Sequence, residues 1–304
     1  MSTHAREVAR GQRFEFGKNW QQFLRAITPY QIAQAEGSLQ TMLGVPELSG
    51  STFLDAGCGS GLSSLAARRL GARVHSFDFD PQSVACTEEL KRRYFPDDPL
   101  WTIEVASVLD VAYLESLGKY DLVYSWGVLH HTGALWRAME NMTIPLTPGG
   151  RLFIAIYNHQ LYWTWWHTRL KRTYVSAPRP LQWIIAGGYA SFEVTKGLVK
   201  DLALARNPLA RYRQDKRPRG MSWWYDTLDW IGGYPYETAT PNEVFDFYQP
   251  RGFVLERLDV SSGHGCSQFV FRKALNQWVW NKQPYLLSIV PKPIEPNQES
   301  SSDS

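Results

Sequence analysis

The chain has 304 residues, of which 44% are hydrophobic and 14% aromatic, so it can bury a substantial core and is not an intrinsically disordered protein. Its three cysteines, Cys58, Cys86 and Cys266, stand far apart, which excludes a disulfide framework and is typical of a protein of the reducing cytoplasm. The charged N-terminus shows no apolar signal segment. The most apolar stretch outside the central motifs, 181–192, is too short to cross a bilayer. We therefore expect a cytoplasmic protein without a transmembrane segment.

Residues 1–50 predict an N-terminal helical cap, because apolar side chains recur there at spacings of three and four. Residues 51–158 then alternate between strand-like and helix-like patterns. Strands are predicted at 51–57, 72–80, 100–108, 119–129 and 149–158, and helices at 62–71, 81–95 and 132–146. This alternation is typical of right-handed βαβ units, so we predict an α/β fold with a Rossmann-like, doubly wound, mostly parallel sheet.

The alternation stops after the fifth predicted strand. Residues 159–239 hold seven of the 13 tryptophans and predict an inserted helical and loop segment that acts as a substrate lid. These tryptophans stand in apolar runs such as YWTWW and LQWII, and we expect them to be buried. Residues 240–273 predict a helix and an antiparallel C-terminal edge hairpin that complete the sheet. Residues 274–304 predict a C-terminal extension with a polar, disordered end.

Positive charge is concentrated in one part of the chain. The window 167–219 carries 12 Lys and Arg against three acids, although the whole chain has a net charge of only +3. Such a block can form a solvated helical face, or it can attract an anionic small molecule, a nucleic acid or an acidic membrane. The sequence leaves these alternatives open.

The strongest chemical motif is FLDAGCGSG at 53–61, where a strand enters a glycine-rich turn that opens a helix. Gly57, Gly59 and Gly61 let the backbone approach a ligand, and the helix start presents free N–H groups. Asp78 ends the next predicted strand, where a carboxylate can accept hydrogen bonds from two ribose hydroxyls. The glycine spacing is neither the dinucleotide fingerprint nor a Walker phosphate loop.

Four motifs in sequence order, LDAGCGSG, FDFDP, YDLVYSWGVLHH and LTPGGRLFIAIYN, resemble those of class I S-adenosylmethionine (SAM) dependent methyltransferases. The resemblance covers about residues 50–158, and residues 240–273 are similar to the last helix and strand pair of that fold. It implies that SAM is the cofactor and that the protein methylates a small molecule.

The resemblance also implies which residues bind SAM. Asp55 would lie near the methionyl end, Asp78 would hold the ribose, and Phe79 would pack on the adenine. The remaining cofactor candidates lie in the glycine turn, in the loop after the third strand, at the end of the fourth strand and in the N-terminal cap: Gly57, Gly59, Gly61, Ser107, Val108, Trp126 and Trp20. The family often has an aspartate where Ser107 stands, and Asp110 can take over that role. For Asp55, stabilisation of the turn is the alternative.

Four residues are candidates for a role in catalysis. His130 and His131 follow the fourth strand, where a neutral imidazole can take a proton from the acceptor or can simply pack and orient. Asn158 ends the fifth strand and can bind substrate or cap the loop. Asp229 lies in the insertion and can act as an acid or base, or belong to a lid that only packs on the sheet. No metal is expected, because no carboxylate joins the two histidines at ligand spacing.

We therefore predict transfer of the sulfonium methyl group by an SN2 step to an oxygen, nitrogen or carbon of a small acceptor, either anionic or aromatic. The alternative enzyme class is a SAM cyclase or lyase that releases methylthioadenosine. A nucleic-acid methyltransferase and a SAM-binding protein without activity are less favoured, and a homodimer is left open.

Overall fold

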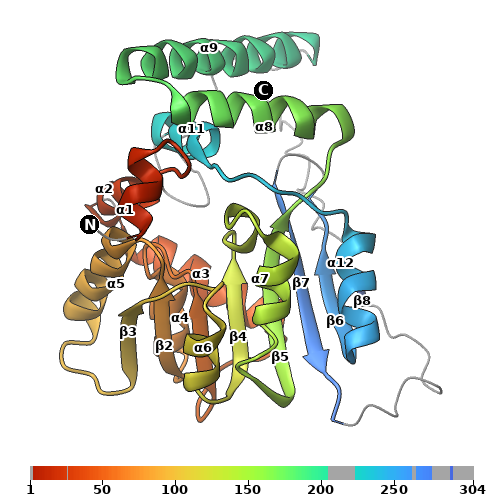
Figure 1. Ribbon diagram of the computed structural model, residues 1–304. Coiled ribbons are helices and arrows are strands. Elements are labelled where there is room, and N and C mark those ends of the chain that lie inside the picture. Colours follow the sequence, from red (N-terminus) through yellow and green to blue (C-terminus); the bar gives the residue numbers. More distant parts are fainter. Residues whose placement is uncertain (1–2, 26, 205–222, 262–264, 276–287, 290–304) are drawn as a thin grey trace, which may run out of the picture.

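The computed structural model describes residues 3–25, 27–204, 223–261, 265–275 and 288–289. In these residues a single sheet of eight strands has the order β3-β2-β1-β4-β5-β7-β6-β8 (Figure 1). The strands are β1 (Thr52–Ala56), β2 (Arg73–Asp78), β3 (Trp101–Val105), β4 (Tyr120–Trp126), β5 (Leu146–Tyr157), β6 (Phe253–Asp259), β7 (Cys266–Lys273) and β8 (Ser288–Ile289). Neighbours from β3 to β5 are parallel, whereas β7 is antiparallel to both β5 and β6. The predicted doubly wound sheet with an antiparallel C-terminal pair is confirmed.

The described helices are α1 (Thr3–Ala9), α2 (Phe16–Arg25), α3 (Pro29–Leu43), α4 (Leu62–Arg69), α5 (Pro81–Tyr94), α6 (Val111–Ser116), α7 (Leu135–Asn141), α8 (Leu161–Ser176), α9 (Arg179–Ala203), α11 (Trp223–Gly232) and α12 (Pro241–Tyr248). Local chemistry fixes several of their starts. The Asp80 side chain accepts a hydrogen bond from the Gln82 N–H at the start of α5. Thr240 and Glu243 form a capping box at the start of α12, with Pro241 in its first turn.

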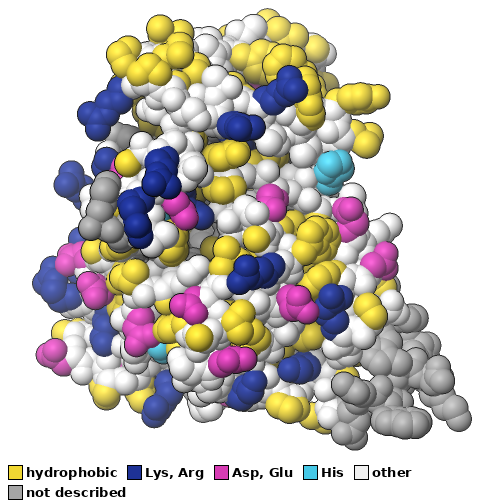
Figure 2. All heavy atoms as spheres, viewed as in Figure 1, with side chains coloured by type: hydrophobic (Ala, Val, Ile, Leu, Met, Phe, Trp, Pro, Cys, Tyr) yellow, Lys and Arg dark blue, Asp and Glu magenta, His cyan; other side chains and the backbone are white. Residues whose placement is uncertain are grey.

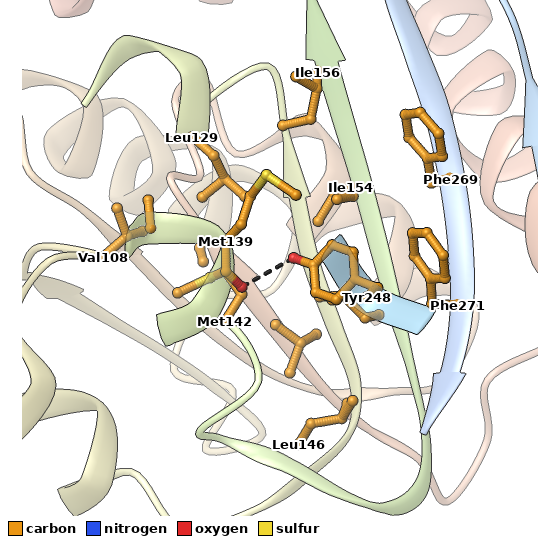
Figure 3. Close-up of a cluster of buried hydrophobic side chains, with 14 of the residues drawn as sticks. Val108, Leu129, Met139, Met142, Leu146, Ile154, Ile156, Tyr248, Phe269 and Phe271 are labelled. Atoms are coloured by element: carbon orange, nitrogen blue, oxygen red, sulfur yellow. Dashed lines mark hydrogen bonds between the residues drawn. The ribbon is translucent and has the colours of Figure 1, made fainter. Parts of the chain in front are cut away.

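The sheet has a hydrophobic layer on each face, because alternate strand residues point to opposite sides. Leu54 and Ile154 belong to the cluster beneath α6, α7 and α12, and Figure 3 shows this cluster around Met139 and Tyr248. The buried Tyr248 hydroxyl donates to the Met139 carbonyl at 2.9 Å and so ties α12 to α7. Phe53 and its neighbours on the other face pack against α3, α4 and α5.

The insertion forms the helices α8, α9 and α11, which lie beyond the end of the sheet to which the parallel strands point (Figure 1). A small third cluster joins them, with Tyr174, Ala186 and Ile231 buried at its centre. The expectation that the tryptophans of this segment are buried is wrong for Trp163, Trp165, Trp166 and Trp183, whose exposed fractions lie between 51% and 62%. Trp183 stacks on the Trp224 ring of α11 at a centroid distance of 6.0 Å, and Trp163 stacks on the His167 ring at 5.9 Å, so these contacts cover only part of each indole.

No helix in the described part of the chain is long and apolar enough to cross a membrane. The predicted disorder of the polar C-terminal end falls on residues that lie outside the described ones. The five segment boundaries drawn from the sequence stay predictions.

Candidate active site

The turn between β1 and α4 takes the shape that its glycines allow. Gly57 and Gly59 have φ values of +87° and +54°, a region that other residues rarely adopt. A Cβ on Gly57 would lie 2.4 Å from a methyl carbon of Val128, and one on Gly59 would lie 3.2 Å from the Trp20 indole nitrogen. Glycine therefore lets the turn fit closely between Val128 and Trp20. Gly61 caps the start of α4 and is not among the residues that line the pocket described below.

Asp78 lies beside this turn at the end of β2 and is held by two backbone donors. Its carboxylate accepts hydrogen bonds from the N–H groups of Gly59 and Asp80, each at 2.9 Å. Burial raises the pKa of Asp78 to about 6, although both hydrogen bonds act in the opposite direction. The predicted ribose-binding carboxylate thus stands at the carboxyl edge of the sheet, next to the glycine turn.

Asp55, one strand away, is the second buried carboxylate of this region. It accepts a hydrogen bond from the Ser64 hydroxyl, which in turn lies 2.7 Å from the Ser76 hydroxyl. The Trp101 indole N–H donates to the Ser76 hydroxyl and completes this series of hydrogen bonds. Burial raises the pKa of Asp55 to about 7, with the nearby Asp78 adding to the effect. The observed partners fit the turn-stabilising alternative, while Asp55 also reaches the pocket wall.

These groups line one large pocket of about 940 Å³. Its volume is near the upper end of the range of about 300–1,000 Å³ that is typical of small-molecule sites. The predicted residues that the pocket brings together are Asp55, Gly57, Gly59, Asp78, Phe79, Ser107, Val108, Trp126, Trp20, His131 and Asp229. His130, Asn158 and Gly61 are not among its lining residues.

One end of the pocket is built around Phe79 and the loop after β3. His4 contacts the Phe79 ring edge-on at a centroid distance of 5.6 Å, and the Arg13 guanidinium lies 5.0 Å from its centre. Ser107 accepts a hydrogen bond from the Leu109 N–H and so shapes the loop. Asp110 instead caps α6 through the Tyr113 N–H and does not line the pocket.

The N-terminal helices close the pocket from the side. The Gly17 N–H in α2 donates to Asp80 at 2.8 Å, and a Cβ at Gly17 would lie 2.4 Å from the Gln82 Cβ. The lack of a side chain at Gly17 therefore lets α2 lie against the start of α5. This contact carries Trp20 over the glycine turn, where its indole lies against Gly59.

The two consecutive histidines have different surroundings. His130 is completely buried, its Nδ1 accepts from the Tyr157 N–H at 3.3 Å, and its Nε2 has no hydrogen-bond partner among the described residues. His131 Nδ1 lies 2.7 Å from the Pro235 carbonyl, which can only accept, so Nδ1 carries the proton and Nε2 keeps a free lone pair. His131 lines the pocket, whereas His130 supports the end of β5.

The charged groups nearby disfavour protonation of His131. Burial lowers the pKa of His131 to about 3, and the positive charges of Lys171 and Arg13 add to this effect. Arg13 also donates to the His131 carbonyl at 2.9 Å. The side chain is therefore a neutral hydrogen-bond acceptor toward the pocket.

Lys171, in α8, is a buried cation that sequence reasoning missed. It is 0% exposed, donates to the Trp230 carbonyl and lies over the rings of Trp230 and Tyr236. Burial lowers the pKa of Lys171 to about 7, and Asp229 counteracts this shift. A sequence signal for it exists, because His167, Lys171 and Tyr174 follow one another at helical spacing and form a buried face of α8.

Asp229 and Asn158 differ in where they lie. Asp229 reaches the pocket from α11 and accepts a hydrogen bond from the Asn19 amide at 3.2 Å. Asn158 donates to the Ser261 carbonyl at 2.6 Å and accepts from the Ser267 hydroxyl at 2.7 Å. These two bonds link the end of β5 to β7 and to the segment after β6, which matches the loop-capping alternative for Asn158.

Among the described residues no cluster of three His, Cys, Asp or Glu side chains is arranged to hold a metal ion.

The fold is Rossmann-like, and the pocket lies at the carboxyl edge of its parallel strands, the place where such folds hold their ligands. The family model for a methyltransferase domain matches residues 54–152. This stretch lies within the part of the chain, about residues 50–158, whose motifs resemble those of the class I SAM-dependent methyltransferases.

Relatives with named activities share only part of the chain. The ubiquinone biosynthesis O-methyltransferase of Xanthomonas euvesicatoria pv. vesicatoria is 34% identical over 140 residues, which are 44% of this chain and 52% of that protein. The ribosomal protein L11 methyltransferase of Methylococcus capsulatus is 44% identical over 114 residues, 37% of this chain and 36% of that one. The chain thus spans about half or less of the length of these relatives.

A solved structure shows the same fold over more of the chain. The magnesium protoporphyrin IX methyltransferase of Synechocystis PCC 6803 with bound SAH superposes with a TM-score of 0.51 at 14% identity. The match covers 84% of this chain and 94% of that one. At this identity the likeness concerns the fold alone.

Proposed function

We propose that the protein is a SAM-dependent methyltransferase that acts on a small molecule. The observation that carries the proposal is a continuous pocket with two differently built ends. One end holds Asp78 and the glycine turn, and the other holds His131, Asp229 and Trp230. A donor and an acceptor can therefore lie in contact within one pocket.

The first end fits SAM in its charge as well as its shape. Asp55 and Asp78 are both buried with raised pKa values, so each would be stabilised as an anion by hydrogen bonds or by a nearby positive charge. SAM brings ribose hydroxyls, an ammonium group and a sulfonium, and its bound form supplies an activated methyl group for SN2 transfer. Asp78 and the turn at Gly57 and Gly59 would hold its nucleoside and amino-acid parts, with Phe79 beside the adenine.

The second end would bind and orient the acceptor. The neutral Nε2 of His131 can accept a hydrogen bond from an acceptor hydroxyl or amine, because Nδ1 is engaged with Pro235. The Phe16, Tyr157 and Trp230 rings provide flat apolar walls, and Arg13, which donates to the His131 carbonyl, provides positive charge. This combination favours an aromatic or anionic acceptor. Holding the nucleophile close to the methyl group is the main contribution that such walls make to the rate.

The names of relatives point in the same direction, because one of them methylates an oxygen in ubiquinone biosynthesis. We favour an oxygen nucleophile on an aromatic ring for this reason. No nucleic-acid partner is proposed. A cytoplasmic location and a homodimer stay predictions.

Product analysis tests the proposal. The purified protein is incubated with SAM alone, and then with SAM and a protein-free small-molecule cell extract, and the nucleosides are identified by mass spectrometry. SAM is expected to stay intact without acceptor, and S-adenosylhomocysteine is expected to accumulate with the extract. Methylthioadenosine formed from SAM alone would instead establish a SAM cyclase or lyase. Failure of SAM to bind, measured by calorimetry, would reject both functions.

The neutrality of His131 has a consequence for stability that can be measured without an acceptor. The pKa of His131 is about 3 in the folded protein and near the ordinary value of 6.5 in the unfolded chain. As the pH falls, the unfolded chain therefore protonates His131 at a higher pH than the folded protein does. The stability that depends on neutral His131 is present above pH 6.5 and is lost as the pH falls toward 3. From about pH 7 to about pH 5 the free energy of unfolding is expected to fall by about 2 kcal/mol more in the wild type than in the His131→Asn variant. Urea titrations of both proteins at each pH measure this difference, and parallel pH curves would contradict the assignment.

A further inference from the structure

The outward face of α9 carries an apolar stripe that no other part of the described chain covers. Leu181, Ile184, Phe192, Val199 and Leu202 are between 42% and 69% exposed. Their spacing places them on one side of the helix. The opposite side of α9 is the one that packs on the protein, because Ala186 and Ala190 are buried there. This helix is thus apolar on two faces, of which only one has a partner among the described residues.

Helix α8 continues the apolar surface with aromatic side chains. Leu161, Tyr162, Trp163, Trp165 and Trp166 are all more than half exposed. Figure 2 shows hydrophobic side chains gathered at the end of the molecule where Figure 1 places α8 and α9, with Lys and Arg beside them. We call the exposed side chains of α8 and α9 the α8–α9 face.

The charged side chains of this face are almost all positive. The exposed Lys and Arg residues on the two helices are Arg169, Arg172, Arg179, Lys196 and Lys200. The acids on these helices are Glu193, which pairs with Lys196 at 2.6 Å, and Asp201, which is buried. The next segment of the sequence, 205–222, contains six more Lys and Arg against one Asp.

We propose that the α8–α9 face binds the surface of a membrane that contains anionic lipids. Exposed aliphatic and tryptophan side chains flanked by basic residues are the composition of helices that lie in the interface between lipid headgroups and acyl chains. Lys and Arg near the surface add attraction to anionic headgroups. The helices lie on the membrane and do not span it. The proposal concerns docking and does not depend on the methyl-transfer activity.

Charge decides between this partner and two others. A second copy of the chain that used the same face would bring two positive surfaces together, which is unfavourable. A nucleic acid would match the charge, but it would leave the aliphatic stripe of Ile184, Val199 and Leu202 against phosphates. An anionic bilayer satisfies both the charge and the apolar surface.

Co-sedimentation with vesicles tests the proposal on the full chain. The wild type is expected to pellet with vesicles of equal parts phosphatidylcholine and phosphatidylglycerol, and much less with vesicles of phosphatidylcholine alone. The double variant Ile184→Glu with Val199→Glu is expected to bind the mixed vesicles at least tenfold more weakly. Its matched control is Val105→Glu with Val254→Glu, which changes two exposed valines of the sheet and is expected to bind as the wild type does.

A second pair of variants isolates the charge. Arg169→Gln with Arg172→Gln is expected to lose about fivefold in vesicle affinity for each charge removed. The control Lys18→Gln with Arg92→Gln removes two exposed charges of α2 and α5 and is expected to have no such effect. Calorimetric SAM binding by every variant verifies that the fold is intact.

Three outcomes would overturn the proposal. The wild type does not bind the mixed vesicles at all, or it binds them equally well after the α9 substitutions. In the third outcome, no vesicle binding occurs, and sedimentation velocity shows a dimer that the α9 substitutions disrupt. The α8–α9 face would then be an interface between two copies of the chain.

Discussion

Replacement of Asp78 by Asn is expected to weaken SAM binding by about 100-fold or more. The carboxylate lies beside the glycine turn at the end of β2, where it accepts from the Gly59 and Asp80 N–H groups. Hydrogen bonds to a charged group contribute about 1.5–3 kcal/mol each, so the loss of two with a ribose corresponds to at least a hundredfold in affinity. Isothermal titration calorimetry with SAM measures the effect directly.

A matched variant separates this effect from a general weakening of the fold. Asp110 also follows a strand by a few residues, but it caps α6 and does not line the pocket. The Asp110→Asn variant is expected to lose a little stability and to bind SAM within about twofold of the wild type. Equal losses of affinity in both variants would show that Asp78 acts through the fold. Unchanged affinity in Asp78→Asn would remove it from the site.

The Gly57→Ala variant is expected to lose about 2–5 kcal/mol of stability. Two costs combine at this position. The φ of +87° strains any residue with a Cβ by about 1–2 kcal/mol, and a Cβ lying 2.4 Å from Val128 overpacks the turn by about 1–3 kcal/mol more. Urea unfolding followed by circular dichroism measures the loss, and SAM affinity is expected to fall with it.

Two further variants resolve the costs at Gly57. Gly118 has a φ of +79°, and no atom of the described residues lies within 4 Å of the place that its Cβ would take. Gly118→Ala is therefore expected to show the backbone strain alone. The double variant Gly57→Ala with Val128→Ala removes the two methyl groups but keeps the Cβ of residue 128, which lies 2.9 Å from the place of the new Cβ. Measured against Val128→Ala alone, the cost of Gly57→Ala is expected to fall toward that of Gly118→Ala and to stay above it. A cost that stays the same in both backgrounds would show that Val128 is not the obstacle.

The parts of the fold that follow from local pattern were predictable. The alternation of strands and helices from β1 to β5 is visible because buried strands in a parallel sheet are short apolar runs that end in glycine or polar residues. The start of α12 was predicted from Thr240 and Pro241 and is confirmed by its capping box. The short helix α6 and the two-residue strand β8 were not predicted, since elements of this length carry too few residues to show a period.

The site was predictable where residues occupy the ends of strands. Asp55, Asp78 and His131 reach one pocket because the carboxyl ends of parallel strands lie at one edge of the sheet. The choice between His130 and His131 was not predictable, because it depends on contacts with Tyr157 and Pro235, which lie far away in the sequence. Lys171 was counted only as one of many positive charges, and its burial follows from packing against α11. Apolar runs such as YWTWW also do not reveal whether the chain or an external partner covers them.

The walls of the pocket come from four separate stretches of the described chain, within residues 4–39, 55–157, 229–230 and 265–268. Asp78 and the glycine turn lie within residues 54–152, whereas Phe16 comes from the N-terminal helix α2, and Asp229 and Trp230 come from α11. These three side chains of the proposed acceptor end can therefore be exchanged without altering Asp78 or the glycine turn. A lineage that keeps the first set and varies the second can acquire new substrates through point substitutions, with the chemistry of the donor preserved at every step.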